Sequence, residues 1–489
     1  MHDKLLEYLP TIAAILSFGL AFFTAVKVIA DTHSSTKTLA YLLVVFFIPI
    51  LGSIIYFSFG VNYRKKRLYS RKIVADSKLM EEIEKRHYSF SQKIALEEQE
   101  KLLCHSDMVT LLLNESRSPL SRNKATLLVN GEKKFPEVLK CLEAAKDFIH
   151  IEYYIYDHDE IGKQIADILM RKAKEGVTVR FIYDDFGSHG IKKSLVRQLR
   201  EAGVKVFPFY KIKLFFFANR LNYRDHRKII VVDGKVGFIG GINVSDRYIN
   251  GEKQDGKLYW RDTHIKLEGP SVSSLQFNFL TNWNFCSGEN IQADRYYFPI
   301  LVAEGKGEDL VQVVAGGPDY PRSSIMLSYF AAIVSAVQKV YITSPYFIPN
   351  DSIRDALQKA ALSGIDVRLL VPEVSDSKFV NAASRSYYGE LIACGVKVYL
   401  YKKGFVHAKT MVVDENLSIV GTANMDSRSF DLNFEIIAVV YSKRICSELE
   451  SSFLKDIEDS DEITLEEWAK RTRFSRFVDK VARLVSPLL

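Results

Sequence analysis

Two copies of one short pattern hold the residues of this sequence that are best suited to chemistry. The copies are His226, Lys228, Asp233 and His407, Lys409, Asp414. Attack on a phosphodiester needs a nucleophile, a proton donor for the leaving alkoxide, and cations that offset charge on the non-bridging oxygens. One neutral imidazole can attack phosphorus while the other, protonated, donates to the departing oxygen. The pattern therefore predicts phosphodiester chemistry through a phosphohistidine.

The supporting roles follow from the same residues. We expect no metal and no other cofactor, so the lysines must hold the phosphate. We expect the two aspartates to pair with the imidazoles and to fix their tautomers, as an aspartate supports the histidine of a serine-protease triad.

The duplication argues against coincidence. A single His-x-Lys on a strand is most often a surface strand that ends at a turn aspartate. Here each copy is followed at the same distance by glycine and then by asparagine, which makes that explanation improbable. The residues of this second echo are expected to contact substrate, and they are Gly240, Gly241, Asn243, Gly421 and Asn424.

The elements that carry the motif read as strands. Residues 229–232 and 410–413 are apolar and mostly β-branched, so the histidine and lysine of each copy, two residues apart, point to one face. Each aspartate ends its strand at a turn. Residues 236–239 and 417–420 are expected to return as antiparallel neighbours, bringing the asparagines to the same end.

Alternating strands and helices surround these motifs, and they occur twice. The predicted order is a strand at 148–155, a helix at 160–175, a strand at 177–183, a second helix and a strand that ends at Phe209. Residues 176–182 are echoed by 364–370, and residues 202–206 by 394–398. We therefore predict an α/β fold of two duplicated domains, at 122–300 and 301–460, each a mixed sheet flanked by helices.

The N-terminus predicts a membrane hairpin over residues 1–62. Two apolar runs, at about 9–30 and 38–59, meet the length of roughly 20 residues that hydrocarbon requires. A cleavable signal peptide is the alternative for the first run, but no convincing cleavage site precedes Asp31 and a second span follows. Lysine and arginine crowd residues 64–72, which predicts a cytoplasmic body on the cell membrane. Residues 63–121 are expected to form a charged helical linker.

Composition excludes some classes of site. The net charge of +7 suits an anionic membrane and does not demand nucleic acid. The five cysteines are scattered without a Cys-x-x-Cys pair, which argues against a zinc site or a disulfide framework.

The paired motifs resemble the phospholipase D superfamily, and nearly the whole chain is similar to the bacterial cardiolipin synthase family. The segments that carry the resemblance are residues 48–60, 183–188, 222–228, 344–349, 424–429, 433–435 and 486–489. The resemblance implies metal-independent phosphatidyl transfer between two phosphatidylglycerol molecules, giving cardiolipin and glycerol. It also implies His226 as nucleophile, His407 as general acid and Glu435 in substrate binding. Spacing leaves the reverse assignment of the two histidines open.

Two further segments predict contact with lipid. Residues 211–220 form an aromatic and basic insertion before the first motif, expected either to dip into the bilayer or to form an ordinary buried run. Residues 461–489 are expected to contain a basic amphipathic helix, on the membrane surface or packed on the body.

Three rival functions use the same features. A hydrolytic phospholipase D differs only in letting water attack the phosphohistidine, and a nuclease or other phosphodiesterase needs the same two motifs. The predicted spans weigh against nucleic acid. The intact motifs weigh against a non-enzymatic lipid-binding scaffold.

Overall fold

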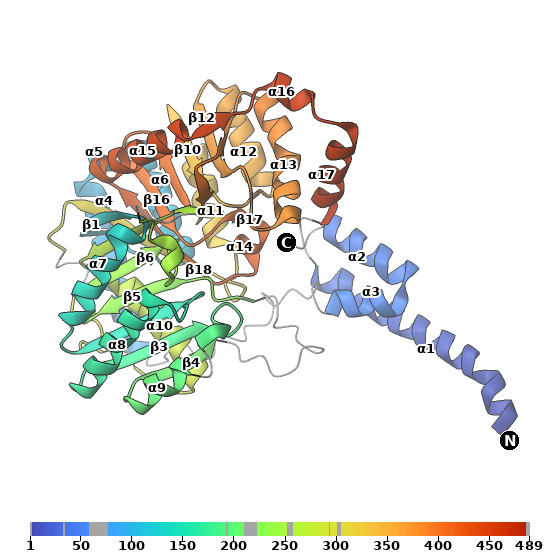
Figure 1. The fold of residues 1–489 in the computed structure, drawn as a ribbon, viewed down its shortest axis with the longest axis horizontal. Helices are drawn as coiled ribbons and strands as arrows, with labels where there is room; N and C mark the ends of the chain where they lie inside the picture. Colours follow the sequence, from blue (N-terminus) through green and yellow to red (C-terminus); the bar gives the residue numbers. More distant parts are fainter. Residues whose placement is uncertain are drawn as a thin grey trace. The chain divides into compact units, whose positions relative to one another are not determined.

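The computed structural model of this protein divides into two compact units. One contains residues 1–71 and 212–223, and the other, called the body below, contains residues 72–211 and 224–489. Figure 1 shows the ribbon of the chain. The structure describes residues 2–32, 35–57, 77–191, 194–209, 223–251, 258–292, 294–300 and 305–485.

The N-terminal unit contains three apolar helices. They are α1 (His2–Asp31), α2 (Ser35–Phe47) and α3 (Pro49–Ile55). Among the described residues one helix, Pro10–Asp31, is long and apolar enough to cross a membrane. The second predicted span is divided, because Ile48 adopts φ −136° and ψ 73° before Pro49. A residue that precedes proline is disfavoured in the helical region, which explains the break.

The three helices of this unit pack on one another. The Thr24 hydroxyl of α1 donates to the Ser53 hydroxyl of α3 at 2.9 Å, and the Tyr56 hydroxyl donates to the carbonyl of Lys27 at 3.0 Å. A Cβ at Gly52 would lie 2.6 Å from the Val44 carbonyl oxygen, so only glycine allows α2 and α3 to approach so closely.

A single sheet of fifteen described strands forms the centre of the body. Its order is β19-β13-β12-β10-β15-β16-β18-β9-β1-β8-β6-β5-β2-β3-β4. The first half supplies β1 (Ser121–Val129), β2 (Phe148–Tyr153), β3 (Thr178–Asp184), β4 (Lys205–Phe209), β5 (Lys228–Val232), β6 (Val236–Gly240) and β8 (Thr263–Glu268). The second half supplies β9 (Asp309–Gly316), β10 (Lys339–Thr343), β12 (Asp366–Pro372), β13 (Lys397–Tyr401), β15 (Thr410–Val413), β16 (Leu417–Gly421), β18 (Glu435–Tyr441) and β19 (Ser460–Glu462).

The strand order reads the same from both sides of the β1–β9 pair, apart from the additional β19. In each half three parallel strands at the outside continue into antiparallel strands toward the centre. The sheet is therefore mixed and duplicated, as predicted. The hairpins β5–β6 and β15–β16 are antiparallel, which confirms the predicted return of each motif strand.

Helices cover both halves of the sheet (Figure 1). The first half contains α7 (Asn130–Glu143), α8 (Glu160–Lys174), α9 (Leu195–Glu201) and α10 (Val272–Ser287). The second contains α11 (Ser324–Val334), α12 (Asp351–Leu362), α13 (Lys378–Ala393), α14 (Ser427–Asp431) and α15 (Lys443–Glu458). Short elements complete the connections: η4 (His189–Ile191), η6 (Asp246–Tyr248), β7 (Tyr259–Arg261), β11 (Phe347–Ile348), β14 (Gly404–Val406) and β17 (Met425–Asp426).

The two halves share a hydrophobic core. Ile229 and Ile265 of the first half are buried in one cluster with Val313, Val412 and Ile436 of the second. Burial of apolar surface is worth about 25 cal/mol per Å², so neither half could separate without exposing this core.

The segment predicted as a linker is packed against the body where the structure describes it. It forms α4 (Ser77–Glu97), α5 (Gln99–Leu102), η3 (Leu103–His105) and α6 (Ser106–Ser116). Leu102, Met108 and Leu112 are buried in the same cluster as Leu310 and Tyr329 of the second half. The many charged residues of this segment led to the prediction of a linker, whereas its apolar residues form part of the core.

The C-terminal segment forms α16 (Leu465–Ala469) and α17 (Arg473–Val485), and α17 lies beside α13 (Figure 1). Ala482 is buried, and Asp479 accepts from the Arg385 guanidinium at 3.1 Å. Of the two predicted positions of this helix, packing on the body is therefore correct for one face of α17. The opposite face is apolar and exposed, with Phe474 at 75% and Phe477 at 63%.

Candidate active site

The two motif histidines lie just before their strands, His226 ahead of β5 and His407 ahead of β15. Their side chains keep only 11% and 10% exposure. The lysines that follow are buried, and each ammonium group donates to the carbonyl of its own histidine: Lys228 Nζ to His226 O at 2.7 Å, and Lys409 Nζ to His407 O.

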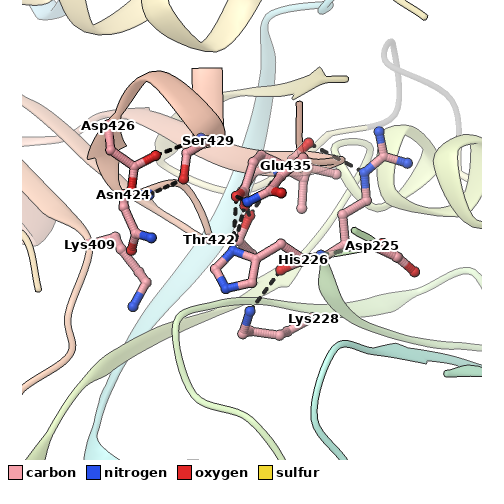
Figure 2. Close-up of polar contacts among 12 residues, drawn as sticks. Asp225, His226, Lys228, Lys409, Thr422, Asn424, Asp426, Ser429 and Glu435 are labelled. Atoms are coloured by element: carbon pink, nitrogen blue, oxygen red, sulfur yellow. Dashed lines mark hydrogen bonds and ion pairs between the residues drawn. The ribbon is translucent and has the colours of Figure 1, made fainter. Parts of the chain in front are cut away.

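Each imidazole pairs with a carboxylate from the other half of the body. His226 Nδ1 lies 2.8 Å from Glu435 Oε1, as Figure 2 shows. His407 Nδ1 lies 2.7 Å from Asp262 Oδ2. Both carboxylates are fully buried. The pairs are thus exchanged between the halves, because each half supplies the histidine of one pair and the carboxylate of the other.

Glu435 and Asp262 occupy equivalent places in the duplicated sheet. Gly421 of β16 pairs with Ile437, two residues after Glu435. Gly240 of β6 pairs with His264, two residues after Asp262. The register of the central strands therefore sets both carboxylates at the same end of the sheet as the histidines.

Backbone hydrogen bonds hold the exchanged segments together. The His226 amide donates to the Phe434 carbonyl at 3.0 Å, and the Phe434 amide donates to the Arg224 carbonyl at 2.8 Å. In the other pair, β14 runs parallel to β7, and the His407 amide donates to the Arg261 carbonyl at 2.7 Å. The peptide chain itself thus fixes each histidine beside its partner carboxylate.

This geometry selects one tautomer. An Nδ1–H group that donates to a carboxylate leaves the lone pair of the same ring on Nε2. His226 and His407 thus each offer Nε2 as a nucleophile or base, and each carboxylate stabilises the imidazolium that forms when Nε2 takes a proton.

Burial dominates the protonation of the imidazoles. It lowers the pKa of His226 to about 4, although Glu435 opposes the change. Burial, together with the charge of Lys409, lowers the pKa of His407 to about 3, against the opposing effect of Asp262. Both rings are therefore neutral near pH 7 in the free protein.

The lysines are also affected. Burial lowers the pKa of Lys228 to about 8. Burial and the like charge of Lys228 lower the pKa of Lys409 to about 7. Each lysine also acts on the histidine of the other motif, so the four groups form one electrostatic site. A phosphate anion bound there would offset the repulsion and favour the charged form of all four.

The predicted pairing of the motif aspartates with the imidazoles is wrong. Asp233 accepts from the backbone amides of residues 146, 147 and 148, at 3.0, 2.8 and 2.9 Å. Asp414 accepts in the same way from the amides of residues 337, 338 and 339. Seven residues of extended chain span about 23 Å, so the aspartate and histidine of one motif lie at opposite ends of the strand.

The aspartates instead fix the entry of the neighbouring strands. Each binds the loop that leads into the antiparallel strand beside its own motif strand, β2 beside β5 or β10 beside β15. Asp233 and Asp414 adopt φ of 51° and 52°, left-handed conformations that aspartate tolerates better than most residues. These contacts with backbone amides, remote from the imidazoles, explain why each motif contains an aspartate.

The asparagines differ from each other. Asn243 accepts from the Ile155 amide at 3.2 Å and donates to the Tyr248 hydroxyl at 2.9 Å. That hydroxyl lies 3.4 Å from His407 Nδ1, so Asn243 orients a group beside the second imidazole.

Asn424 Oδ1 is buried and has no hydrogen-bond partner among the described residues. Figure 2 shows Asn424 beside Lys409. Asn424 is the better placed of the two to contact a ligand.

Close neighbours explain the three glycines. A Cβ at Gly241 would lie 2.1 Å from Asp262 Oδ1, and one at Gly421 would lie 2.4 Å from the Ile437 side chain. Gly240 has φ of 151° and packs against the backbone of His264. Contact of these glycines with substrate stays a prediction.

Sequence reasoning missed Asp262 and two tyrosines. The ring of Tyr154 contacts the ring of His226 edge-on, with centroids 5.0 Å apart, and Tyr248 contacts His407. Glu435 was expected to bind substrate, whereas its carboxylate binds the first imidazole. The signal that could have revealed Asp262 is the pairing of Gly240 with His264, two residues after Asp262, and the sequence alone does not display this pairing.

Among the described residues, one cluster has the composition of a metal site. Ligand atoms of Cys104, His105 and Asp414 lie within 4.8 Å of one another. However, Asp414 already accepts from three backbone amides, and His105 Nδ1 lies 2.9 Å from the Ser335 hydroxyl. These bonds explain the groups without an ion. The aromatic insertion at 211–220 and the basic cluster at 64–72 lie outside the described residues.

Comparisons with known proteins agree with this architecture. A family model described as cardiolipin synthase, PLD-like domain, matches residues 138–260 and again residues 329–457. A second, described as phospholipase D-nuclease N-terminal, matches residues 19–60. The predicted duplication of a phospholipase D-like domain is therefore confirmed.

Curated relatives match over nearly the full length. The cardiolipin synthase of Alkalihalophilus pseudofirmus is 42% identical over 482 residues, covering 98% of this chain and 94% of that protein. The cardiolipin synthase of Listeria monocytogenes is 41% identical over 487 residues, covering 99% of this chain and 100% of that protein. The crystal structure of a phosphatidylserine synthase from Haemophilus influenzae shares the fold, with a TM-score of 0.57 at 16% identity, over 77% of this chain and 98% of that one.

Proposed function

This chain belongs to the cardiolipin synthase family of phospholipase D-like proteins, and from that premise we propose that it transfers a phosphatidyl group between two phosphatidylglycerol molecules, giving cardiolipin and glycerol. The observation that carries the proposal is the exchanged pairing of two imidazoles with two buried carboxylates beside two buried lysines. Such a site supplies a nucleophile, an acid and two cations in one place.

In the first step Nε2 of His226 attacks phosphorus of the donor. A phosphorus–nitrogen bond forms, the bond from phosphorus to the glycerol oxygen breaks, and His407 Nε2 gives its proton to that oxygen. Glu435 stabilises the positive charge that develops on the His226 ring. His407 acquires its proton more readily once the phosphate is bound, because the anion offsets the lysine charges that lower its pKa.

In the second step the acceptor hydroxyl attacks phosphorus. Its proton passes to His407 Nε2, the phosphorus–nitrogen bond breaks, and His226 is restored. Asp262 stabilises the imidazolium of His407 in both steps. Assignment of His226 as nucleophile and His407 as acid rests on the family resemblance, and exchange of the two roles would leave the bond changes the same.

Phosphate binding falls to the chain's own cations. We assign the non-bridging oxygens to Lys228 and Lys409, with Asn424 as a further contact, so the proposed reaction needs no metal. The two buried ammonium groups support this assignment, because they lie near enough for the charge of Lys228 to lower the pKa of Lys409. An anion bound between them would accept charge-assisted hydrogen bonds from both.

We also propose two membrane spans, at about 9–30 and 38–59, with the body in the cytoplasm. The long apolar α1 and its hydrogen bond to α3 support a hairpin. The basic residues at 64–72 support the orientation, because cytoplasmic flanks of spans are enriched in lysine and arginine. Phosphatidylglycerol and other anionic lipids are then the partners, and nucleic acid is not.

The test is incubation of the purified protein with phosphatidylglycerol, following cardiolipin, phosphatidic acid and glycerol. We expect cardiolipin and glycerol in equal amounts. Phosphatidic acid as the sole lipid product would replace the proposal by a hydrolytic phospholipase D. A His226→Gln variant provides the matched control, because it keeps the size of the side chain and loses the nucleophile.

A further inference from the structure

Transfer between two phospholipids places two phosphodiester groups in the site at once. The donor phosphate receives the attack, and the acceptor carries a second phosphate, separated from the attacking oxygen by the three carbons of its glycerol. Lys228 and Lys409 lie at the histidines and account for the first anion. The second anion needs its own cations, a short distance away.

We propose that Arg224 and Arg428 bind the phosphate of the acceptor phospholipid; this inference rests on the transferase function proposed above. The two arginines come from different halves of the body. Each is half-buried, which suits a group that meets a ligand at the mouth of a site.

Arg224 is fixed by the same backbone that fixes the first histidine. Its carbonyl accepts from the Phe434 amide at 2.8 Å, and Asp225 forms a parallel bridge to Phe434. Side chains two residues apart in an extended segment lie on the same side, so Arg224 and His226 face the same way. The guanidinium lies 4.4 Å from the centre of the Phe186 ring, which holds it by a cation–π contact.

Arg428 approaches from the short helix α14. Its carbonyl accepts from the amides of Leu432 and Asn433, at 2.9 and 3.0 Å, in the turn that leads to Glu435. The two guanidinium groups are near enough for Arg224 to lower the pKa of Arg428, in addition to the larger effect of burial.

Tyr154 connects the arginines to the reacting centre. Its ring contacts the His226 ring, with centroids 5.0 Å apart, and Lys228 Nζ lies 5.6 Å from its centre. Both arginines act electrostatically on the same tyrosine. The pair thus lies within electrostatic range of the tyrosine that contacts the nucleophile.

A phosphodiester suits this pair better than another ligand. A planar guanidinium presents two parallel N–H groups that match two phosphate oxygens, and two like charges that repel each other are stabilised by an anion between them. Asp184 and Asp426 also lie nearby, and they reduce the net positive charge. Asp184 accepts from the backbone amides of Phe186 and Gly187, so its carboxylate is directed partly to the peptide chain.

The inference concerns the choice of acceptor. Water and simple alcohols carry no phosphate and gain nothing from the arginines, whereas phosphatidylglycerol does. In the step concerned, the acceptor oxygen bonds to phosphorus, the bond to His226 breaks, and the proton passes to His407. The arginines hold the acceptor in place and take no part in the bond changes.

The test uses one donor and two competing acceptors. Full-length protein is given phosphatidylglycerol together with ethanol, and cardiolipin and phosphatidylethanol are measured in the same sample. For Arg224→Gln and for Arg428→Gln we expect the ratio of cardiolipin to phosphatidylethanol to fall about tenfold or more, as charge-assisted phosphate contacts are lost. Arg354→Gln is the matched control, since Arg354 is half-buried on α12 and pairs with Asp351 at 2.9 Å. Its ratio should equal that of the unaltered protein.

The outcomes distinguish failure of this inference from failure of the proposed function. An unchanged ratio in both arginine variants overturns the inference and leaves the transferase intact. Unaltered protein that forms phosphatidylethanol but no cardiolipin overturns the proposed function itself. Where a glutamine variant forms neither product, the Arg224→Lys and Arg428→Lys variants replace it, because lysine keeps the charge and loses the fork. An unchanged ratio in those active lysine variants would also count against recognition by the guanidinium.

Discussion

His407 and Asp262 are 145 residues apart in the chain, and their side chains meet at 2.7 Å. The corresponding pair, His226 and Glu435, spans 209 residues and meets at 2.8 Å. A duplicated domain could have supplied each histidine with a carboxylate of its own. Because the carboxylates are exchanged, a complete site forms only when the two halves of the body are joined.

The first prediction concerns the carboxylate that sequence reasoning missed. Asp262→Asn should lower kcat by about 10²–10⁴-fold, because an amide no longer fixes the tautomer of His407 or stabilises its imidazolium. The rate of cardiolipin formation measures the loss, and circular dichroism checks that the fold is retained.

A second substrate separates the two carboxylates. Phosphatidyl-p-nitrophenol has a leaving group that departs without an acid, so Asp262→Asn should release p-nitrophenol in a single turnover nearly as fast as the unaltered protein. Glu435→Gln should stay slow with the same substrate, because Glu435 supports the nucleophile. The opposite pattern would show that His407 attacks and His226 donates the proton.

The second prediction concerns Asp414, whose carboxylate binds three backbone amides. Asp414→Asn keeps an oxygen acceptor and tolerates the left-handed conformation, but it loses the charge. We expect the free energy of unfolding to fall by about 1–3 kcal/mol in denaturant titrations. Activity per folded molecule should change far less than in Asp262→Asn. A large loss of activity without loss of stability would show that Asp414 takes part in the reaction.

Much of the fold could be predicted because it depends on local pattern. Apolar, β-branched runs gave the motif strands, and the repeated order of elements gave the duplicated mixed sheet. The histidine and lysine of each motif could be placed together because residues two apart on a strand lie on one face.

The pairing of the imidazoles could not be predicted, since it depends on register between segments far apart in the chain. The loop from Asn243 to Asp262 is eight residues longer than the loop from Asn424 to Glu435, so the two carboxylates do not echo in sequence. Asp233 was assigned to the imidazole because it is close in sequence, whereas an extended strand carries it away.

The third prediction concerns the pH dependence of kcat/KM for release of p-nitrophenol from phosphatidyl-p-nitrophenol, which reports groups of the free enzyme and needs no proton from His407. His226 must be neutral to attack, and burial lowers its pKa to about 4, so activity should rise through that region. Burial lowers the pKa of Lys409 to about 7, so activity should fall as the pH rises above 7 and the phosphate loses a cation. A profile that is flat from pH 6 to 9 would contradict this assignment.

Stability should change in the opposite direction over the alkaline range. An unfolded lysine has a pKa of about 10.4, so between about pH 7 and that value the unfolded chain binds more protons than the folded one at Lys409. The free energy of unfolding therefore gains from this residue as the pH rises. Lys409→Met should remove that gain, which comparison of denaturant midpoints at pH 7 and pH 9 would detect. Alkaline loss of activity is then not loss of fold.

The last prediction concerns α17, whose outer face we expect to lie on an anionic bilayer. Phe474, Phe477 and Leu484 are 75%, 63% and 80% exposed, and the exposed cations Arg473 and Arg476 flank them. An amphipathic helix of this kind buries its apolar face at the headgroup boundary while its cations meet anionic lipid.

Fluorescence can locate this face in the full-length protein. In vesicles of phosphatidylglycerol with brominated acyl chains, tryptophan at 477 in the Phe477→Trp variant should be quenched relative to the parent protein. Leu362→Trp is the control, because Leu362 is 72% exposed at the end of α12, on a helix that has no basic amphipathic face of this kind. Equal quenching at both positions, or none at position 477, would mean that α17 packs on α13 without meeting lipid. Quenching at 477 alone would make the C-terminal helix a second point of membrane contact, in addition to the N-terminal helices.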